Sequence, residues 1–104
     1  MNLKKTLPPI QHPGLLLKEG IDEYGISQYR LGKELSIAHS TISGICHGRQ
    51  SITVPIALKL GKYLGTSAEY WINLQRRHDM ETEQDRISGE LAKKEISFCV
   101  DATN

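Results

Sequence analysis

Apolar residues recur at intervals of three or four along most of this chain, which is the spacing of one face of an α-helix. The first such pattern places Leu17, Ile21 and Tyr24 on a common face. Pro13 suits the first position of a helix, and Gly25 supplies its end. We therefore expect a first helix between Pro13 and Gly25, with the three apolar side chains turned inward.

The second predicted helix covers residues 28–35 and is followed by a break at residues 36–37. Ser27 precedes this helix as its N-cap, and Leu31 and Leu35 form its inward face. Two short helices separated by so short a break are expected to pack against each other.

A third helix is predicted from about His39 to His47, before Gly48. Its periodicity leaves two choices open, because Ile42 can be buried together with either Ile45 or Cys46. The other face carries small polar residues, namely His39, Ser40, Thr41, Ser43 and Gly44.

Two further helices follow, separated by Gly65. The fourth has Thr53 as its N-cap and tolerates Pro55 in its first turn. Thr66 and Glu69 have the spacing of a capping box, which predicts the start of the fifth helix. The inward residues are Ala57, Leu60 and Leu64 of the fourth helix and Tyr70, Trp71, Leu74 and Met80 of the fifth.

The sequence predicts an all-α fold, because no segment alternates apolar and polar residues in the manner of a strand. We divide the chain into an N-terminal arm at 1–11, a helical domain at 12–80 and an acidic C-terminal extension at 81–104. Residues 81–97 are compatible with a helix but largely polar. They form either a loose extension or a helix that a partner stabilises.

Composition limits the possible classes of protein. The 104 residues, 38% of them hydrophobic, are enough for one compact domain with a small core. No stretch approaches the roughly eighteen apolar residues of a membrane span, and the N-terminus lacks a signal-peptide core, so we expect a cytoplasmic protein. Cys46 and Cys99 form no CxxC pair and are interpreted as reduced thiols. His39 and His47 lie about 12 Å apart along one predicted helix, too far to share zinc, so neither a metal nor a cofactor is expected.

The net charge of +1 conceals an asymmetry along the chain. Residues 1–77 contain ten Lys and Arg and five Asp and Glu, a net charge of +5. Residues 78–104 contain three Lys and Arg and seven Asp and Glu, a net charge of −4. A basic body suits a polyanion, and an acidic tail suits either solvent or a protein partner. The acidic residues are scattered, and no phosphate loop, nucleophile elbow or zinc motif occurs, so an enzyme is not expected.

The second and third predicted helices have the spacing of a helix-turn-helix, in which the second helix lies in the DNA major groove. Gly32 is small where the two helices would cross. Side chains that enter a groove about 12 Å wide must be short enough for close approach and polar enough to meet base edges. Ser40, Thr41 and Ser43 meet both needs, whereas a merely solvated helix more often carries Glu, Lys and Gln.

Other side chains flank this hydroxyl run. Gln28, Arg49 and Gln50 are candidate phosphate contacts. His39 is either a groove or phosphate contact or simply exposed, and the remaining histidines are interpreted as surface or capping residues. Trp71 is assigned to the core or to a dimer interface with Tyr70 and Leu74, in preference to a platform for stacking single-stranded nucleic acid.

The motifs HPG at 12–14, SQYRLGKEL at 27–35, STIS at 40–43 and YWINLQ at 70–75 resemble those of HigA-type antitoxins, within the phage-repressor-like helix-turn-helix class. This resemblance covers roughly residues 11–80 and implies a five-helix domain in a homodimer that binds operator DNA of its own operon. It also implies a toxin partner like HigB, a ribosome-dependent mRNA endonuclease of the RelE type. The alternative is a stand-alone helix-turn-helix repressor without a toxin.

The sequence departs from the family pattern at three positions. Ala38 replaces a frequent serine cap before the third helix, Gly44 a frequent arginine within it, and Ser36 a common glycine of the turn. If Ser36 adopts the left-handed conformation, this costs on the order of 1 kcal/mol. Without that arginine, a bidentate contact to guanine is not available from the third helix.

Overall fold

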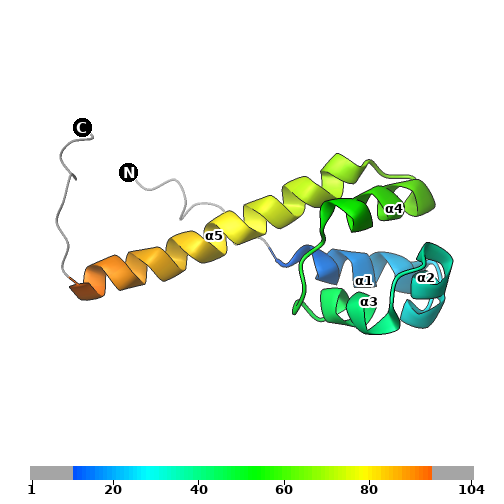
Figure 1. The fold of residues 1–104 in the computed structure, drawn as a ribbon, viewed down its shortest axis with the longest axis horizontal. Helices are drawn as coiled ribbons and strands as arrows, with labels where there is room; N and C mark the ends of the chain where they lie inside the picture. Colours follow the sequence, from blue (N-terminus) through cyan, green and yellow to red (C-terminus); the bar gives the residue numbers. More distant parts are fainter. Residues whose placement is uncertain (1–10, 95–104) are drawn as a thin grey trace.

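The computed structural model describes residues 11–94, and in this part of the chain it contains five helices and no strand. They are α1 (Pro13–Glu23), α2 (Gln28–Leu35), α3 (His39–Cys46), α4 (Val54–Leu64) and α5 (Ala68–Lys94). The predicted all-α class is confirmed. The helices α1–α4 and the start of α5 form a compact head, from which the rest of α5 projects as a rod (Figure 1). The predicted arm, except for its last residue Gln11, and the last ten residues of the chain lie outside the described range.

All five helices contribute to one hydrophobic core. Its most deeply buried side chains are at most 4% exposed: Leu17, Ile21, Leu31, Ile42, Ile45, Cys46, Ile52, Ala57, Leu60 and Trp71. Each large aliphatic side chain among them contributes roughly 1.5–3 kcal/mol by leaving water. The helical periodicity therefore predicted the inward face of α2, α3 and most of α4 correctly. Both residues that were predicted as alternative inward partners of Ile42 in α3 are buried, because Ile45 and Cys46 are each 0% exposed.

Three residues predicted to face inward are exposed. One is Tyr70, at 45%, which also belongs to the predicted dimer interface, and the other two are Tyr24 and Met80. Tyr24 is 74% exposed, because α1 ends at Glu23 and Tyr24 lies in the turn beyond it. Met80 is 55% exposed, because α5 has left the head by that point. Tyr24 therefore lies beyond the end of its helix, whereas Met80 lies on a part of α5 that no longer packs against the core.

The predicted capping box at the start of α5 is also wrong. The helix begins at Ala68, and the backbone N–H of Tyr70 donates to the Ser67 hydroxyl at 3.1 Å. Thr66 instead accepts a hydrogen bond from the indole N–H of Trp71 at 2.8 Å. Thr66 therefore satisfies the one polar atom of the buried tryptophan.

Helix α5 runs without a break through the region predicted to be either loose or helical. Its exposed surface carries ion pairs one turn apart, including Arg77 with Glu81 at 3.8 Å and Arg86 with Glu83 at 2.8 Å. The hydrogen bond that Arg86 donates to the Glu83 carboxylate at 2.9 Å raises the pKa of Arg86 above its usual value. Such exposed pairs add little to helix stability, because solvent and salt screen the charges. None of the described helices is long and apolar enough to cross a membrane.

Candidate nucleic-acid interface

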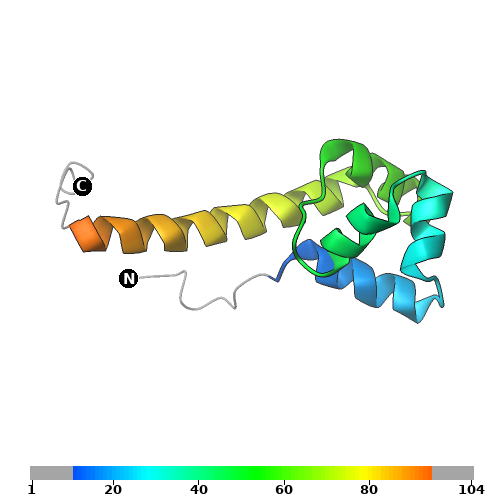
Figure 2. The ribbon, with the colours of Figure 1, turned by 60° about the horizontal axis from the view of Figure 1, so that its bottom comes forward.

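Helices α2 and α3 pack against each other through a tight turn (Figures 1 and 2). Ser27 caps α2 as predicted, accepting a hydrogen bond from the backbone N–H of Arg30 at 3.0 Å. Ser36 adopts the left-handed conformation with φ 56°, and the backbone N–H of Ile37 donates to the carbonyl of Gly32 at 2.8 Å. Ser36 is the only non-glycine residue in the described range with a positive φ, and its strain is on the order of 1 kcal/mol.

Gly32 is required by the close approach of the turn to α2. A Cβ at this position would lie 2.7 Å from the carbonyl oxygen of Ile37 and 3.5 Å from Cγ1 of Ile42. The first contact is closer than side chains tolerate, and it involves backbone that cannot swing aside. The predicted need for a small residue where these helices meet is therefore confirmed.

The N-terminal part of α3 exposes the polar run. His39 and Ser40 are exposed, and Thr41 and Ser43 are half-buried. Ala38 occupies the N-cap, and no side chain makes a capping hydrogen bond to the first turn. The Tyr29 and His39 rings lie 6.1 Å apart, which brings the start of α2, where Gln28 is half-buried, close to the start of α3.

Gly44 was assigned to the polar face, and this assignment is wrong. Gly44 is buried beneath the side chain of Gln50, whose Cδ would lie 3.0 Å from a Cβ at that position. Its carbonyl accepts hydrogen bonds from the backbone of Arg49 at 2.7 Å and of Gln50 at 3.1 Å. Position 44 therefore lies where the loop after α3 closes, and a side chain there would require the Gln50 side chain to move aside.

The loop between α3 and α4 carries Arg49 and Gln50 on the surface, and a side chain of α5 holds this loop through a hydrogen bond. Gln75 is only 5% exposed, and its Oε1 accepts a hydrogen bond from the backbone N–H of Ile52 at 2.8 Å. Its amide group donates to Asp79 at 3.0 Å. Gln75 thus orients the segment that presents the two candidate phosphate contacts, a role that the sequence analysis missed.

His12 ties the same loop to the start of α1. Its Nδ1 accepts a hydrogen bond from the backbone N–H of Gly14 at 2.9 Å, which confirms a capping role, and its ring lies 5.0 Å from that of His78. Burial lowers the pKa of His12, and His78 lowers it further, whereas Asp79 and a hydrogen bond to the backbone of Gln50 act in the opposite direction. Neutral His12 therefore links α1, the loop and α5.

Gly14 brings the start of α1 against the C-terminal end of α3. A Cβ at Gly14 would overlap the backbone carbonyl of Ile45, so only glycine allows this packing. Pro13 is buried in the first turn beside it. The motif HPG thus places the base of the candidate recognition helix through a cap, a helix start and a close approach.

His47 lies at the surface, as predicted for the histidines other than His39. His47 Nδ1 lies 2.7 Å from the carbonyl oxygen of Ser43 in the same helix, at the C-terminal end of α3. No group of three potential metal ligands occurs within residues 11–94.

Trp71 is buried within the single chain, whereas Tyr70 is 45% exposed and Leu74 is half-buried. The assignment of Tyr70, Trp71 and Leu74 to a dimer interface stays a prediction, with Tyr70 offering most of the surface.

Comparison with known protein families identifies the same helix-turn-helix unit. A family model described as helix-turn-helix matches residues 17–71, which include α2, the turn, α3 and the loop that Gln75 holds. The chain belongs to the helix-turn-helix family. The match ends at Trp71, so the distal part of α5 lies beyond the shared domain.

Relatives of this helix-turn-helix protein include virulence-associated protein I of Dichelobacter nodosus, 37% identical and aligned over 97% of this chain and 92% of the relative. Antitoxin HigA-1 of Vibrio cholerae is 28% identical over 79% of this chain and 77% of its own. The solved structure of Pseudomonas aeruginosa antitoxin HigA with the higBA promoter matches with a TM-score of 0.75 and 30% identity, over 88% of this chain and 99% of that one. The resemblance to HigA-type antitoxins is thereby confirmed, and the chain is a DNA-binding protein of the antitoxin type related to HigA.

Acidification is expected to destabilise this domain through His12. The folded state holds its pKa below the ordinary 6.5, so the unfolded chain binds the proton more readily. The contribution of neutral His12 is complete above that ordinary value and is lost as the pH falls through 6.5 towards the lowered folded pKa. Urea unfolding at about pH 7.5 and pH 5.5 measures this difference.

His12→Asn tests the assignment, because asparagine caps a helix without titrating in this range. We expect this variant to lose the part of the pH dependence that the lowered pKa of His12 contributes. His47→Asn, at an exposed position, serves as the control and should keep the dependence of the native chain. Equal pH dependence in the native chain and His12→Asn would refute the role of His12.

Proposed function

We propose that this protein is a homodimeric antitoxin that binds double-stranded operator DNA of its own operon and neutralises a HigB-like mRNA endonuclease in the cytoplasm. The observation that carries the DNA-binding part is the surface formed by the start of α3 and the adjoining loop. Short hydroxyl side chains lie on the helix, and Arg49 and Gln50 lie on a loop that Gln75 and His12 fix.

We assign two roles within this surface. Ser40, Thr41 and Ser43 meet base edges, because their hydroxyl groups donate to or accept from bases and the threonine methyl group packs on thymine. Gln28, Arg49 and Gln50 contact phosphates, with His39 at the boundary between the two groups. Phosphate contacts set affinity and register, whereas base contacts set sequence preference.

The two roles predict different effects of substitution. Arg49→Ala should weaken binding to all DNA sequences and reduce the slope of log K against log salt by about one unit. Thr41→Ala should mainly reduce the preference for operator over unrelated DNA, by roughly 1–3 kcal/mol if it removes one base contact. Gel-shift titrations at several salt concentrations separate the two results. If neither variant changed operator affinity, the assignment of this surface would be wrong.

A homodimer supports specific binding, because two helix-turn-helix units related by a two-fold axis read half-sites about 34 Å apart. Tyr70 is the exposed aromatic residue of the predicted dimer interface, with Leu74 half-buried near it. Static light scattering at micromolar concentration should give a mass near twice the 11.7 kDa of one chain. A monomer at that concentration would contradict the dimer.

A basic toxin is the second proposed partner, and two acidic surfaces suit it by charge. One is the exposed side of α1 with Glu19, Asp22 and Glu23, of which Asp22 also pairs with Lys18 at 3.1 Å. The other is the segment beyond Met80, where residues 81–104 contain six Asp and Glu and three Lys and Arg.

Co-expression with the product of the adjacent gene tests this partner. The antitoxin function predicts that the neighbouring product stops growth alone, that this chain restores growth, and that the two proteins purify together. Charge reversal of Glu19, Asp22 and Glu23, compared with truncation after Met80, identifies the contributing surface. If neither neighbouring gene encodes a toxic protein that this chain binds, the stand-alone repressor is the correct function.

A further inference from the structure

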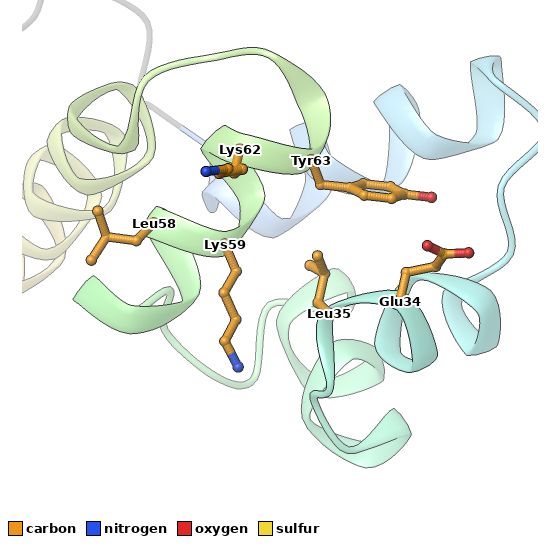
Figure 3. Close-up of a pocket in the computed structure, with 6 residues that line it drawn as sticks. All are labelled: Glu34, Leu35, Leu58, Lys59, Lys62 and Tyr63. Carbon is orange, nitrogen blue, oxygen red and sulfur yellow. The ribbon is translucent and has the colours of Figure 1, made fainter.

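A groove of about 540 Å³ lies between α2 and α4, and none of its lining residues is among those assigned to DNA. Its lining residues are Glu34, Leu35, Leu58, Lys59, Lys62 and Tyr63. Leu35 points from α2 into the gap, and the Tyr63 ring reaches from α4 over Glu34 (Figure 3). Leu58 is 59% exposed although it is a large apolar residue. The groove therefore offers an apolar floor with polar groups at its edges.

The charge of α4 sets the chemistry of what fits this groove. Its ionisable acidic and basic groups are Lys59 and Lys62 alone, and neither forms an ion pair with another described residue. By contrast, Lys18, Arg30, Arg77 and Arg86 each have an acidic partner on their own helix. A second copy of the same α4 face would bring lysines against lysines, so a partner with acidic and apolar groups fits better.

The last ten residues of this chain have that composition. EISFCVDATN contains Glu95 and Asp101 but no Lys or Arg, and its apolar residues Ile96, Phe98 and Val100 alternate with smaller ones. An extended chain with this alternation presents its apolar side chains on one side. The groove can then take the apolar residues while the two lysines meet the carboxylates.

The length of α5 decides which copy supplies this segment. Twenty-seven residues of helix span about 40 Å, and α5 leads away from the end of the head where α2 and α4 meet (Figure 1). Phe98 follows Lys94 by only four residues and reaches at most about 14 Å beyond it. The segment is therefore too short to return to the groove of its own chain, but it can enter the groove of another copy.

We propose that residues 95–101 of one copy bind in the groove between α2 and α4 of a second copy, through Ile96, Phe98 and Val100 and through carboxylates paired with Lys59 and Lys62. This contact joins two chains and requires neither DNA nor a toxin. It can therefore fail or succeed separately from DNA and toxin binding, and it uses none of the residues of the predicted dimer interface.

Disulfide trapping between two chains tests the contact directly. A full-length chain carrying Leu58→Cys and Cys99→Ser is mixed with the native chain, which keeps Cys99, under oxidised glutathione. Cys46 is buried in both chains, and burial raises the pKa of its thiol, so it reacts slowly. We expect a covalent heterodimer in which peptide mass spectrometry joins position 58 to Cys99.

Two changes should reduce the yield of this heterodimer. Lys59→Glu with Lys62→Glu should lower it about tenfold, as expected from reversing two charge pairs. Phe98→Ala should lower it without changing any charge. Lys33→Glu is the charge control on α2, and Tyr24→Cys, at an exposed position just after α1, is the control for random collision. Circular dichroism confirms that each variant stays helical.

Three results would overturn the proposal. One is a yield at Leu58→Cys no higher than at Tyr24→Cys, and another is a yield unchanged by both the lysine reversal and Phe98→Ala. The third is a disulfide within a single chain when Leu58→Cys is combined with native Cys99. If the lysine reversal weakens DNA binding and no heterodimer forms, the two lysines belong to the DNA contact instead.

Discussion

Replacing Gly14 with alanine is expected to lower the free energy of unfolding by about 3 kcal/mol or more, at the upper end of overpacking effects. The added Cβ would overlap the backbone carbonyl of Ile45, so α1 and α3 must separate. Because α3 carries the candidate DNA-contacting residues, operator affinity should fall as well. Urea unfolding followed by circular dichroism measures the first effect, and a gel-shift titration measures the second.

Gly20→Ala is the matched control in the same helix. A Cβ at Gly20 meets no atom within 4 Å, so the same substitution removes only the helix penalty of glycine. We expect α1 to become more stable by up to about 1 kcal/mol. Equal effects at the two positions, in either direction, would contradict the close approach of Gly14 to Ile45.

Replacing Gln75 with methionine is expected to cost about 1–3 kcal/mol, because the buried backbone N–H of Ile52 loses its acceptor while the side-chain volume changes little. The loop that carries Arg49 and Gln50 would also lose its anchor on α5. At equal concentrations of folded protein, we therefore expect DNA affinity to fall several-fold, through a role of Gln75 in positioning this loop.

Asn73→Met provides the control for this substitution, because Asn73 lies on an exposed face of α5 and bonds only to Arg76 among the described contacts. Its effect on stability should stay within about 0.5 kcal/mol. If Gln75→Met unfolds at the same urea concentration as the native chain, the hydrogen bond to Ile52 contributes nothing measurable. If stability falls but DNA affinity per folded molecule is unchanged, Gln75 does not position the loop.

The sequence was sufficient for features that depend on neighbouring residues. The start of α1 at Pro13, the Ser27 cap and the small residue at Gly32 follow from local rules of backbone geometry, and all agree with the structure. The inward face of α2 followed from periodicity in the same way. Even the strain at Ser36 followed from the required turn, since a left-handed residue is needed between these helices.

The features that the sequence analysis missed depend on residues far apart in the chain. Gln75 lies 23 positions from Ile52, and no local pattern reveals that the loop needs an acceptor there. A polar residue one turn after the buried Trp71, on the inward side, was the available signal. Gly44 was misassigned for the same reason, because only the return of the loop places Gln50 over it.

We expect α3 and the adjoining loop to read a specific DNA sequence. The most direct measurement is a titration of the native chain with DNA from upstream of its own gene and with shuffled DNA of equal length and composition, at several salt concentrations. The account predicts a preference for the upstream DNA of about a thousandfold or more, with affinity for both falling steeply as salt rises. Equal affinity for the two DNAs at every salt concentration would contradict it.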